Sequence, residues 1–145
     1  MKYYRVVLDT NVLIAAARSK GGASFELLRQ LRLGHFVALA SVPLMLEYEA
    51  VLKRPEHLKP GNRTEAMTDR FLDAMCLRME FVHLFYLWRP QTRDPGDEMV
   101  LETALNGRAD ALITLNLADF DVAKNFRLPV LTPGSFVRQL RKEAL

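Results

Sequence analysis

Short apolar runs, rich in β-branched residues, alternate along the chain with longer segments whose apolar residues recur every three or four positions. The short runs are typical of buried parallel strands, and the longer period is typical of amphipathic helices. The pattern predicts strands at 3–8, 36–40, 81–85 (with an extension to 88 left open), 111–114 and 129–131. It predicts helices at 11–18, 25–33, 42–53, 65–79 and 98–106, a turn or short helix at 117–122, and a last helix starting at 133–135.

This alternation of strand and helix favours one parallel sheet covered on both faces. We therefore expect a single α/β domain over residues 1–145, built as a three-layer α/β/α sandwich around about five strands. Ser24, Ser41 and Thr64 are placed to cap the helices that follow them, and 55–61 is predicted to be a loop.

Composition places the chain among ordinary soluble proteins, because 50% of its 145 residues are hydrophobic and 26% are charged. No apolar run approaches the roughly 20 residues needed to span a bilayer, and the N-terminus lacks the apolar segment of a signal peptide. The single cysteine, Cys76, lies in an apolar helical pattern and is predicted to be a small core residue. These features predict a cytoplasmic protein with no membrane partner.

The net charge is +3, from 20 Lys and Arg against 17 Asp and Glu with His neutral. This balance is only weak support for a nucleic-acid partner. The distribution is more informative, because several acids follow predicted strands while the basic residues are spread over loops and helix faces. A basic surface around an acidic pocket would suit a phosphate-backbone substrate held by metal ions.

Two acids lie at positions where the pattern predicts burial, so each charged side chain needs a partner there. Asp9 ends the first strand, and it serves either a functional site or only as the cap of the next helix. Glu47 has Leu44, Ala50 and Val51 as its helical neighbours, so it projects from the apolar stripe. Glu47 either joins a site or reaches the edge of the core to pair with an arginine.

Two further acidic positions lie near the ends of later strands. Asp97 and Asp94 stand at the start of a predicted helix, where acids are also favoured as caps. Asp119 follows the fourth strand in a turn, and Asn116 lies nearer to the end of that strand. Each of these residues alone is explained by capping, so their meaning depends on whether they meet Asp9.

Taken together, the acids predict a site for a hard divalent cation. Carboxylates crowded at one sheet edge repel one another, and Mg²⁺ or Mn²⁺ bound by oxygen ligands relieves that repulsion. His35, His57 and His83 are isolated in the sequence, so zinc spacing is absent. Metal ions held by carboxylates in a phosphate-handling site can promote hydrolysis of a phosphodiester.

At these residues the chain resembles the PIN-domain ribonucleases, and most of all the VapC-like toxins of toxin–antitoxin systems, in the subgroup of PIN-family toxin components. The stretches that carry the resemblance are 7–14, 41–52 with its continuation to 58, 93–97 with Ala104, and 112–114 leading to Asp119-Phe120. Each stretch alone is weak, but the ordered set is specific and covers nearly the whole chain.

The resemblance implies an α/β/α sandwich and a metal-dependent endoribonuclease that cleaves RNA by water attack. Asp9, Glu47 and Asp97 match the three central acids of the family. Asp9 and Asp97 would bind the principal Mg²⁺ or Mn²⁺, with Glu47 beside them. The supporting positions are Thr10, Asn11, Ser41, Asp94, Thr114 and Asn116. Such proteins are usually homodimers, and the toxins pair with a small antitoxin protein.

The fourth acidic position departs from the common pattern, since many family members have aspartate where this chain has Asn116. This leaves open whether Asp119 or Asn116 fills that position, and whether one or two metal ions bind. The candidate phosphate contacts are Arg18, Lys20, Arg54 and Arg93.

Two other functions compete with the ribonuclease hypothesis. A phosphatase of the aspartyl-phosphate type would use a strand-terminal aspartate as nucleophile, but it needs a second aspartate where this chain has Asn11. A PIN-like module that binds RNA or a protein without cutting it is the second alternative, because Asn116 removes one carboxylate.

Overall fold

The computed structural model describes residues 3–86 and 91–144, and its strands form one five-stranded parallel sheet. Val6 and Val7 on the central strand are fully buried and pair with Ala38 and Leu39 on one side. The strands are β1 (Arg5–Leu8), β2 (Val37–Ala40), β3 (Met79–Phe81), β4 (Ala111–Ile113) and β5 (Val130–Leu131), in the order β3-β2-β1-β4-β5. The α/β prediction with a parallel sheet is confirmed.

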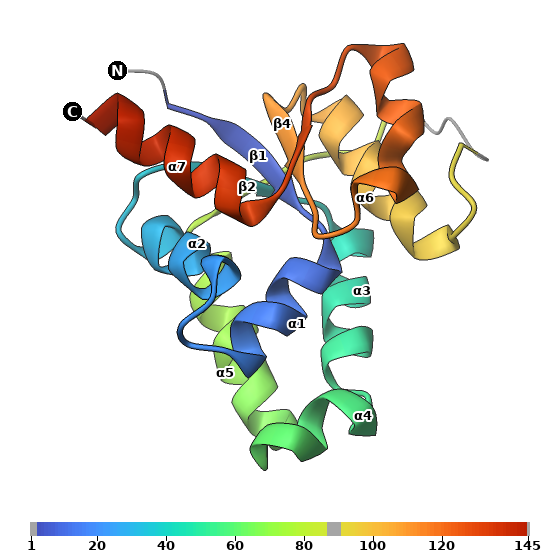
Figure 1. The fold of residues 1–145 in the computed structure, drawn as a ribbon. Coiled ribbons are helices and arrows are strands. Elements are labelled where there is room, and N and C mark those ends of the chain that lie inside the picture. Colours follow the sequence, from blue (N-terminus) through green and yellow to red (C-terminus); the bar gives the residue numbers. More distant parts are fainter. Residues whose placement is uncertain (1–2, 87–90, 145) are drawn as a thin grey trace.

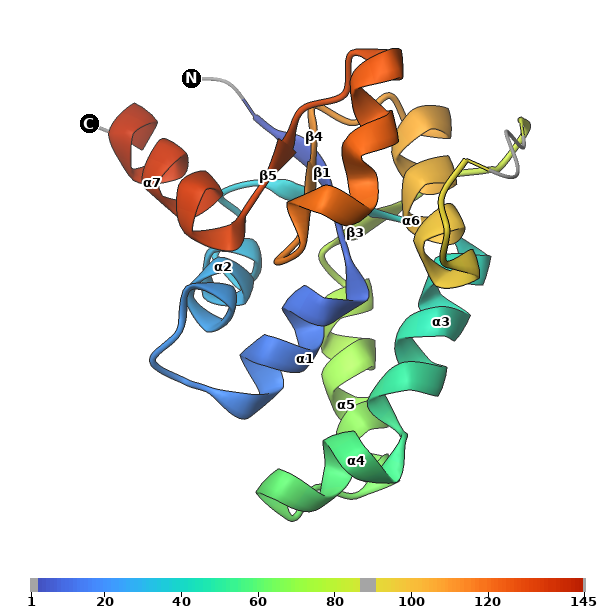
Figure 2. The same cartoon turned by 45° about the vertical axis from the view of Figure 1, so that its right-hand side comes forward.

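Helices cover both faces of this sheet, which gives the expected three layers. They are α1 (Thr10–Arg18), α2 (Ala23–Arg32), α3 (Val42–Leu52), α4 (Pro55–Leu58), α5 (Glu65–Cys76), α6 (Pro95–Asn106) and α7 (Pro133–Ala144), with the 3-10 segments η1 (Lys59–Gly61) and η2 (Leu117–Phe126). Helices α1, α2 and α7 pack together on one face, and α6 with η2 covers the other (Figures 1 and 2). Helix α3 contacts both α1 and α6. Within the described parts of the chain, no helix is long and apolar enough to cross a membrane.

The strand order reverses at the centre of the sheet. The chain moves from β1 outward to β2 and β3, then returns to the other side of β1 as β4 and β5 (Figures 1 and 2). In open parallel sheets, ligands bind beyond the carboxyl ends of the strands at such a switch point. Asp9 and Thr114 directly follow the two strands that flank this point.

The third strand lies earlier in the sequence than expected. Helix α5 ends at Cys76 instead of continuing to 79, and β3 covers Met79–Phe81 instead of 81–85. The spacing of Met75 and Met79 mimics another helical turn, but Met79 is used by the sheet, where it pairs with Ala38. The proposed extension of this strand to 88 reaches residues outside those that the structure describes.

Prolines account for two other differences from the predicted boundaries. Pro95 begins α6, with Asp94 as its N-cap, so Asp97 lies inside the first turn and not ahead of the helix. Pro55 begins α4 in the predicted loop, because a proline ring fixes a helical φ, and its missing N–H costs nothing in the first turn of a helix.

Ser24 does not cap α2, whose N-cap is Gly22.

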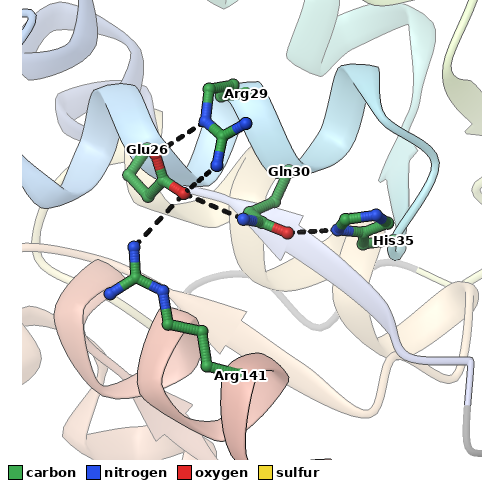
Figure 3. Close-up of polar contacts among 5 residues, drawn as sticks. All are labelled: Glu26, Arg29, Gln30, His35 and Arg141. Atoms are coloured by element: carbon green, nitrogen blue, oxygen red, sulfur yellow. Dashed lines mark hydrogen bonds and ion pairs between the residues drawn. The ribbon is translucent and has the colours of Figure 1, made fainter. Parts of the chain in front are cut away.

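A polar network joins α2 to the C-terminal helix α7 (Figure 3). The Glu26 carboxylate accepts hydrogen bonds from Arg29 at 2.8 and 2.7 Å and from Gln30 at 2.8 Å, and it forms an ion pair with Arg141 of α7 at 3.3 Å. The Gln30 amide oxygen in turn accepts from the His35 ring. Arg29, Gln30 and Arg141 hold the pKa of Glu26 at about 2, below its ordinary 4.5.

This network predicts a small acid-sensitive contribution to stability. A depressed carboxylate pKa stabilises the fold above pH 4.5, and the contribution is lost as the pH falls toward 2. Glu26→Gln should therefore have a lower free energy of unfolding than wild type at pH 7. The difference in unfolding free energy between the two proteins should narrow as the pH falls from 5 to 2. Urea unfolding across this pH range measures the effect. A constant difference at every pH would mean that the charge of Glu26 does not matter.

Candidate functional site

Asp9 is held at the end of β1 as a buried carboxylate, with 6% of its surface exposed. It occupies the N-cap position of α1, yet its side chain makes no capping hydrogen bond. Instead, Oδ2 accepts a hydrogen bond of 2.7 Å from the hydroxyl of Thr114. Burial raises the pKa of Asp9, the Thr114 hydroxyl and the Thr10 amide oppose this, and Asp119 and Asp94 add to it. The capping explanation for this aspartate is therefore weak.

Thr114 connects the ends of β1 and β4. Its hydroxyl oxygen also accepts from Asn11 Nδ2 at 3.3 Å and from the backbone N–H of Asn116 at 3.0 Å. Asn11 Oδ1 accepts from the Leu115 N–H at 3.3 Å, so position 11 is occupied by an amide that braces the strand ends. An aspartyl-phosphate phosphatase would need a carboxylate at this position.

Glu47 reaches the same region from α3. A Cβ atom added to Gly96 would lie 2.9 Å from Glu47 Oε1, so the carboxylate lies directly against the first turn of α6. The two helices are joined by a buried pair of hydroxyls, Ser41 and Thr103, at 2.7 Å. Since Thr103 donates to the Met99 carbonyl at 2.7 Å, Ser41 is the donor in this pair. Ser41 thus fixes α3 against α6.

The charges of four other acids act on Asp97 in the first turn of α6. Burial is the largest cause that raises its pKa, followed by the charges of Asp9, Asp94, Asp119 and Glu47, and together they bring it to about 7. Asp94 also caps α6 by accepting from the Gly96 N–H at 2.8 Å. The fold therefore places the four other acids that the sequence singled out within electrostatic reach of Asp97.

A cavity of about 490 Å³ opens beside these acids. It is lined by Gln91, Thr92, Arg93, Asp94, Asp97, Ala118, Asp119, Asp121 and Val122. The described lining does not include Asp9 and Glu47, which act on Asp97 through their charges. Asn116 donates from Nδ2 to Asp119 Oδ2 at 2.8 Å, so the two candidates for the fourth position contact each other.

The donor set fits a hard divalent cation in its chemistry, since every candidate ligand is a carboxylate oxygen or, for Asn116, an amide oxygen. Burial and, after it, repulsion from the other acids raise the pKa of Asp97, and a bound cation would relieve that repulsion. Among the residues that the structure describes, however, no three acids, histidines or cysteines converge closely enough to hold a metal ion as they lie. Binding would therefore require the carboxylate side chains to turn toward a shared point.

The four candidate phosphate contacts are not gathered at this site. Arg93 lines the cavity with the acids. Arg18 lies at the far end of α1 and donates to the Glu56 carbonyl at 3.0 Å, and Arg54 is exposed at the start of α4. Lys20 lines a separate cavity between α1, α2 and α5. Only for Arg93 does its position support a contact near the acids.

Two acids in or near the site were missed from the sequence. Asp121 lines the cavity and pairs with Lys124 at 3.1 Å, and its spacing of two residues from Asp119 is a faint sequence signal. Glu98 is buried beside Asp97, with 5% of its surface exposed. A glutamate in the first turn of a helix is ordinarily a solvent-exposed residue, so its burial has no signal in the sequence.

Gly96 leaves the space that Glu47 occupies, which gives a testable prediction. Gly96→Ala should keep the fold, because alanine favours the helix and the clash is with the mobile end of a side chain. The displaced Glu47 carboxylate should lower any activity of the site by about 10- to 100-fold. The matched control is Gly134→Ala, since Gly134 also follows the first proline of a helix and has no acid against it. Equal activity of the two variants would contradict the placement of Glu47.

The family model described as PIN domain matches residues 5–118. This range runs from β1 into the start of η2 and includes Asp9, Glu47, Asp97 and Thr114, whereas Asp119 lies just beyond it. No curated protein matches the chain.

Proposed function

Because the chain belongs to the PIN domain family, whose members are typically nucleases, we propose that it is a metal-dependent endoribonuclease. The observation that carries this proposal is the grouping of acids at one cavity: Asp94, Asp97 and Asp119 line it. Burial, followed by the charges of Asp9, Asp94, Asp119 and Glu47, raises the pKa of Asp97 to about 7. Strongly perturbed acids in a cavity are typical of catalytic sites. The cavity also contains Arg93, a group suited to a phosphate.

Asp9 and Asp97 are the proposed ligands of Mg²⁺ or Mn²⁺, with Glu47 and Asp119 as neighbouring oxygen donors. When bound, the ion would supply Lewis-acid chemistry at the scissile phosphate. Glu47 would accept the proton of the attacking water while the phosphorus–oxygen ester bond breaks, and the departing oxygen would take a proton from solvent. Thr114 would keep Asp9 ionised and oriented through its hydroxyl.

The finer proposal is a VapC-like toxin that pairs with a small antitoxin. A second cavity of about 460 Å³ between α1, α2 and α5 supports a protein partner. Its lining includes the apolar residues Phe25, Leu28 and Phe71 and five cations, Lys20, Arg32, Arg63, Arg70 and Arg78. No ion pair between described residues involves these five cations, so an acidic amphipathic helix would suit the groove. Coexpression with the product of a neighbouring small reading frame tests this, because an inhibited complex is expected.

The homodimer and the cytoplasmic location remain parts of the same proposal. Leu46 and Val42 on α3 are 61% and 65% exposed, and apolar residues in this position are suited to an interface between two copies. Sedimentation at several protein concentrations would distinguish a dimer from a monomer.

A module that binds RNA without cutting it is the second candidate. It is favoured by one observation, that the described acids do not converge as they lie into a group able to hold a metal. The distinction depends on whether a divalent cation draws the carboxylates together.

The test is cleavage of single-stranded RNA by the purified chain. We expect cleavage with Mn²⁺ or Mg²⁺ and none in EDTA. RNA binding without cleavage at any concentration of either metal would favour the non-catalytic module.

A further inference from the structure

Glu98 is a buried carboxylate that the proposed chemistry does not use. It follows Asp97 in the first turn of α6, and consecutive residues of a helix point about 100° apart, so the two acids serve different neighbours. Glu98 Oε1 accepts hydrogen bonds from the backbone N–H groups of Gln91 at 2.6 Å and Thr92 at 2.7 Å. These are short bonds to a charged acceptor, which is the strong class of hydrogen bond.

The second oxygen of Glu98 makes this arrangement unusual. Oε2 is buried and has no hydrogen-bond partner in the part of the chain that the structure describes. Burying a carboxylate with one oxygen unsatisfied costs stability. The two bonds to the loop offset some of that cost, so the position of the loop depends on this side chain.

The loop held by Glu98 leads directly into the acidic cavity. Thr92 donates through its hydroxyl to the Asp94 carbonyl at 2.8 Å, which closes the turn around Arg93. Arg93 is exposed, lines the cavity with Asp97, and forms no ion pair with another described residue. Its guanidinium is therefore available to an anion that enters the cavity.

We propose that Glu98 is a positioning residue, whose hydrogen bonds to Gln91 and Thr92 place Arg93 at the cavity to contact an RNA phosphate. This inference rests on the proposed function for its ligand, RNA. It does not require that the RNA be cut, because it concerns where the substrate backbone is held.

The test is binding of a fluorescein-labelled single-stranded RNA in EDTA, followed by anisotropy over a range of salt concentrations. Loss of one phosphate contact weakens binding and reduces the salt slope by about 0.7 for a single strand. Arg93→Ala should show both effects, with Kd raised by about tenfold. Glu98→Ala should reproduce them, and the double variant should bind no more weakly than either single variant.

Two conservative variants separate positioning from a general structural role. Glu98→Gln keeps an acceptor oxygen for Gln91 and Thr92, so RNA binding within twofold of wild type is expected. Glu98→Asp keeps the charge but is one methylene shorter, and it should behave like Glu98→Ala. If Glu98→Ala shows no thermal unfolding transition and is therefore not folded, the RNA binding and salt slopes of Glu98→Gln and Glu98→Asp still test the role of Glu98.

Additive effects of Glu98→Ala and Arg93→Ala, or an unchanged salt slope in Glu98→Ala and Glu98→Asp, would overturn the inference. So would a wild type that does not bind RNA. If the wild type binds RNA but does not cleave it with Mn²⁺, the proposed function fails, while the salt slopes still decide the role of Glu98.

Discussion

Replacing Asp97 with asparagine is expected to lower metal-dependent RNA cleavage by about 10²- to 10³-fold while the protein stays folded. Asparagine keeps the size of the side chain and removes the charge that a divalent cation would meet. Asp97 lies within electrostatic reach of Asp9, Asp94, Asp119 and Glu47, so its loss removes a central donor of the proposed site.

The same variant should be more stable than wild type in EDTA. Burial and four acids raise the pKa of Asp97 to about 7 from 3.8, so the folded protein holds a proton that the unfolded chain releases between these values. Stability contributed by this group therefore falls as the pH rises from 4 to 7. Asparagine does not ionise, so Asp97→Asn does not lose this stability. Its melting temperature should exceed that of wild type at pH 8 but not at pH 4.

With added Mn²⁺ at pH 8, the melting temperature of wild type should exceed that of Asp97→Asn, because a ligand that binds the folded state stabilises it. Asp73→Asn is the matched control, since Asp73 is exposed on α5, away from the site. Wild-type cleavage in Asp97→Asn, or equal stabilisation of both variants by Mn²⁺, would show that Asp97 is no ligand.

Thr114→Val should have the second largest effect, because one hydroxyl serves three partners at the joined ends of β1 and β4. Valine keeps the shape of the fully buried side chain and removes the donor to Asp9 and the acceptor for Asn11 and Asn116. Leaving buried polar groups unpaired should cost about 1–3 kcal/mol of unfolding free energy. Cleavage should fall by about 10- to 100-fold, as for other residues that orient a metal ligand.

The pH dependence of cleavage identifies why Thr114→Val loses activity. The Thr114 hydroxyl lowers the pKa of Asp9, so its removal should shift the acid limb of the cleavage profile to higher pH. Thr114→Ser keeps the hydroxyl and should retain the wild-type profile. An unshifted profile in Thr114→Val would mean that the hydroxyl acts only through stability.

Much of the fold follows from local patterning. The run before Asp9 is apolar at every position from Val6 to Leu8, and all three residues are fully buried in the central strand. Parallel strands share one carboxyl edge, so the pattern placed Asp9 and Thr114 at the same edge. Their contact depends on the pairing of β1 with β4, which the pattern did not predict. The third strand was misplaced, since the apolar spacing of Met75 and Met79 fits a helix as well as the observed register with β2.

The site was less accessible to sequence reasoning because burial depends on tertiary packing. Glu98 is buried by the loop that folds over α6, and that loop has no periodic pattern of its own. In the sequence, Gly96 is an ordinary residue of a helix's first turn. Its importance appears only in the fold, where α3 places Glu47 against it. The positions of Arg18 and Lys20, at the far end of α1, likewise depend on the direction in which the helix leaves the sheet.

Titration calorimetry with Mn²⁺ at pH 8 shows whether these carboxylates form a divalent-metal site. We expect saturable binding to the wild type, much weaker binding to Asp9→Asn and Asp97→Asn, and wild-type binding to Asp73→Asn. If the wild type binds no Mn²⁺, or if all four proteins bind it equally, these carboxylates are not a metal site.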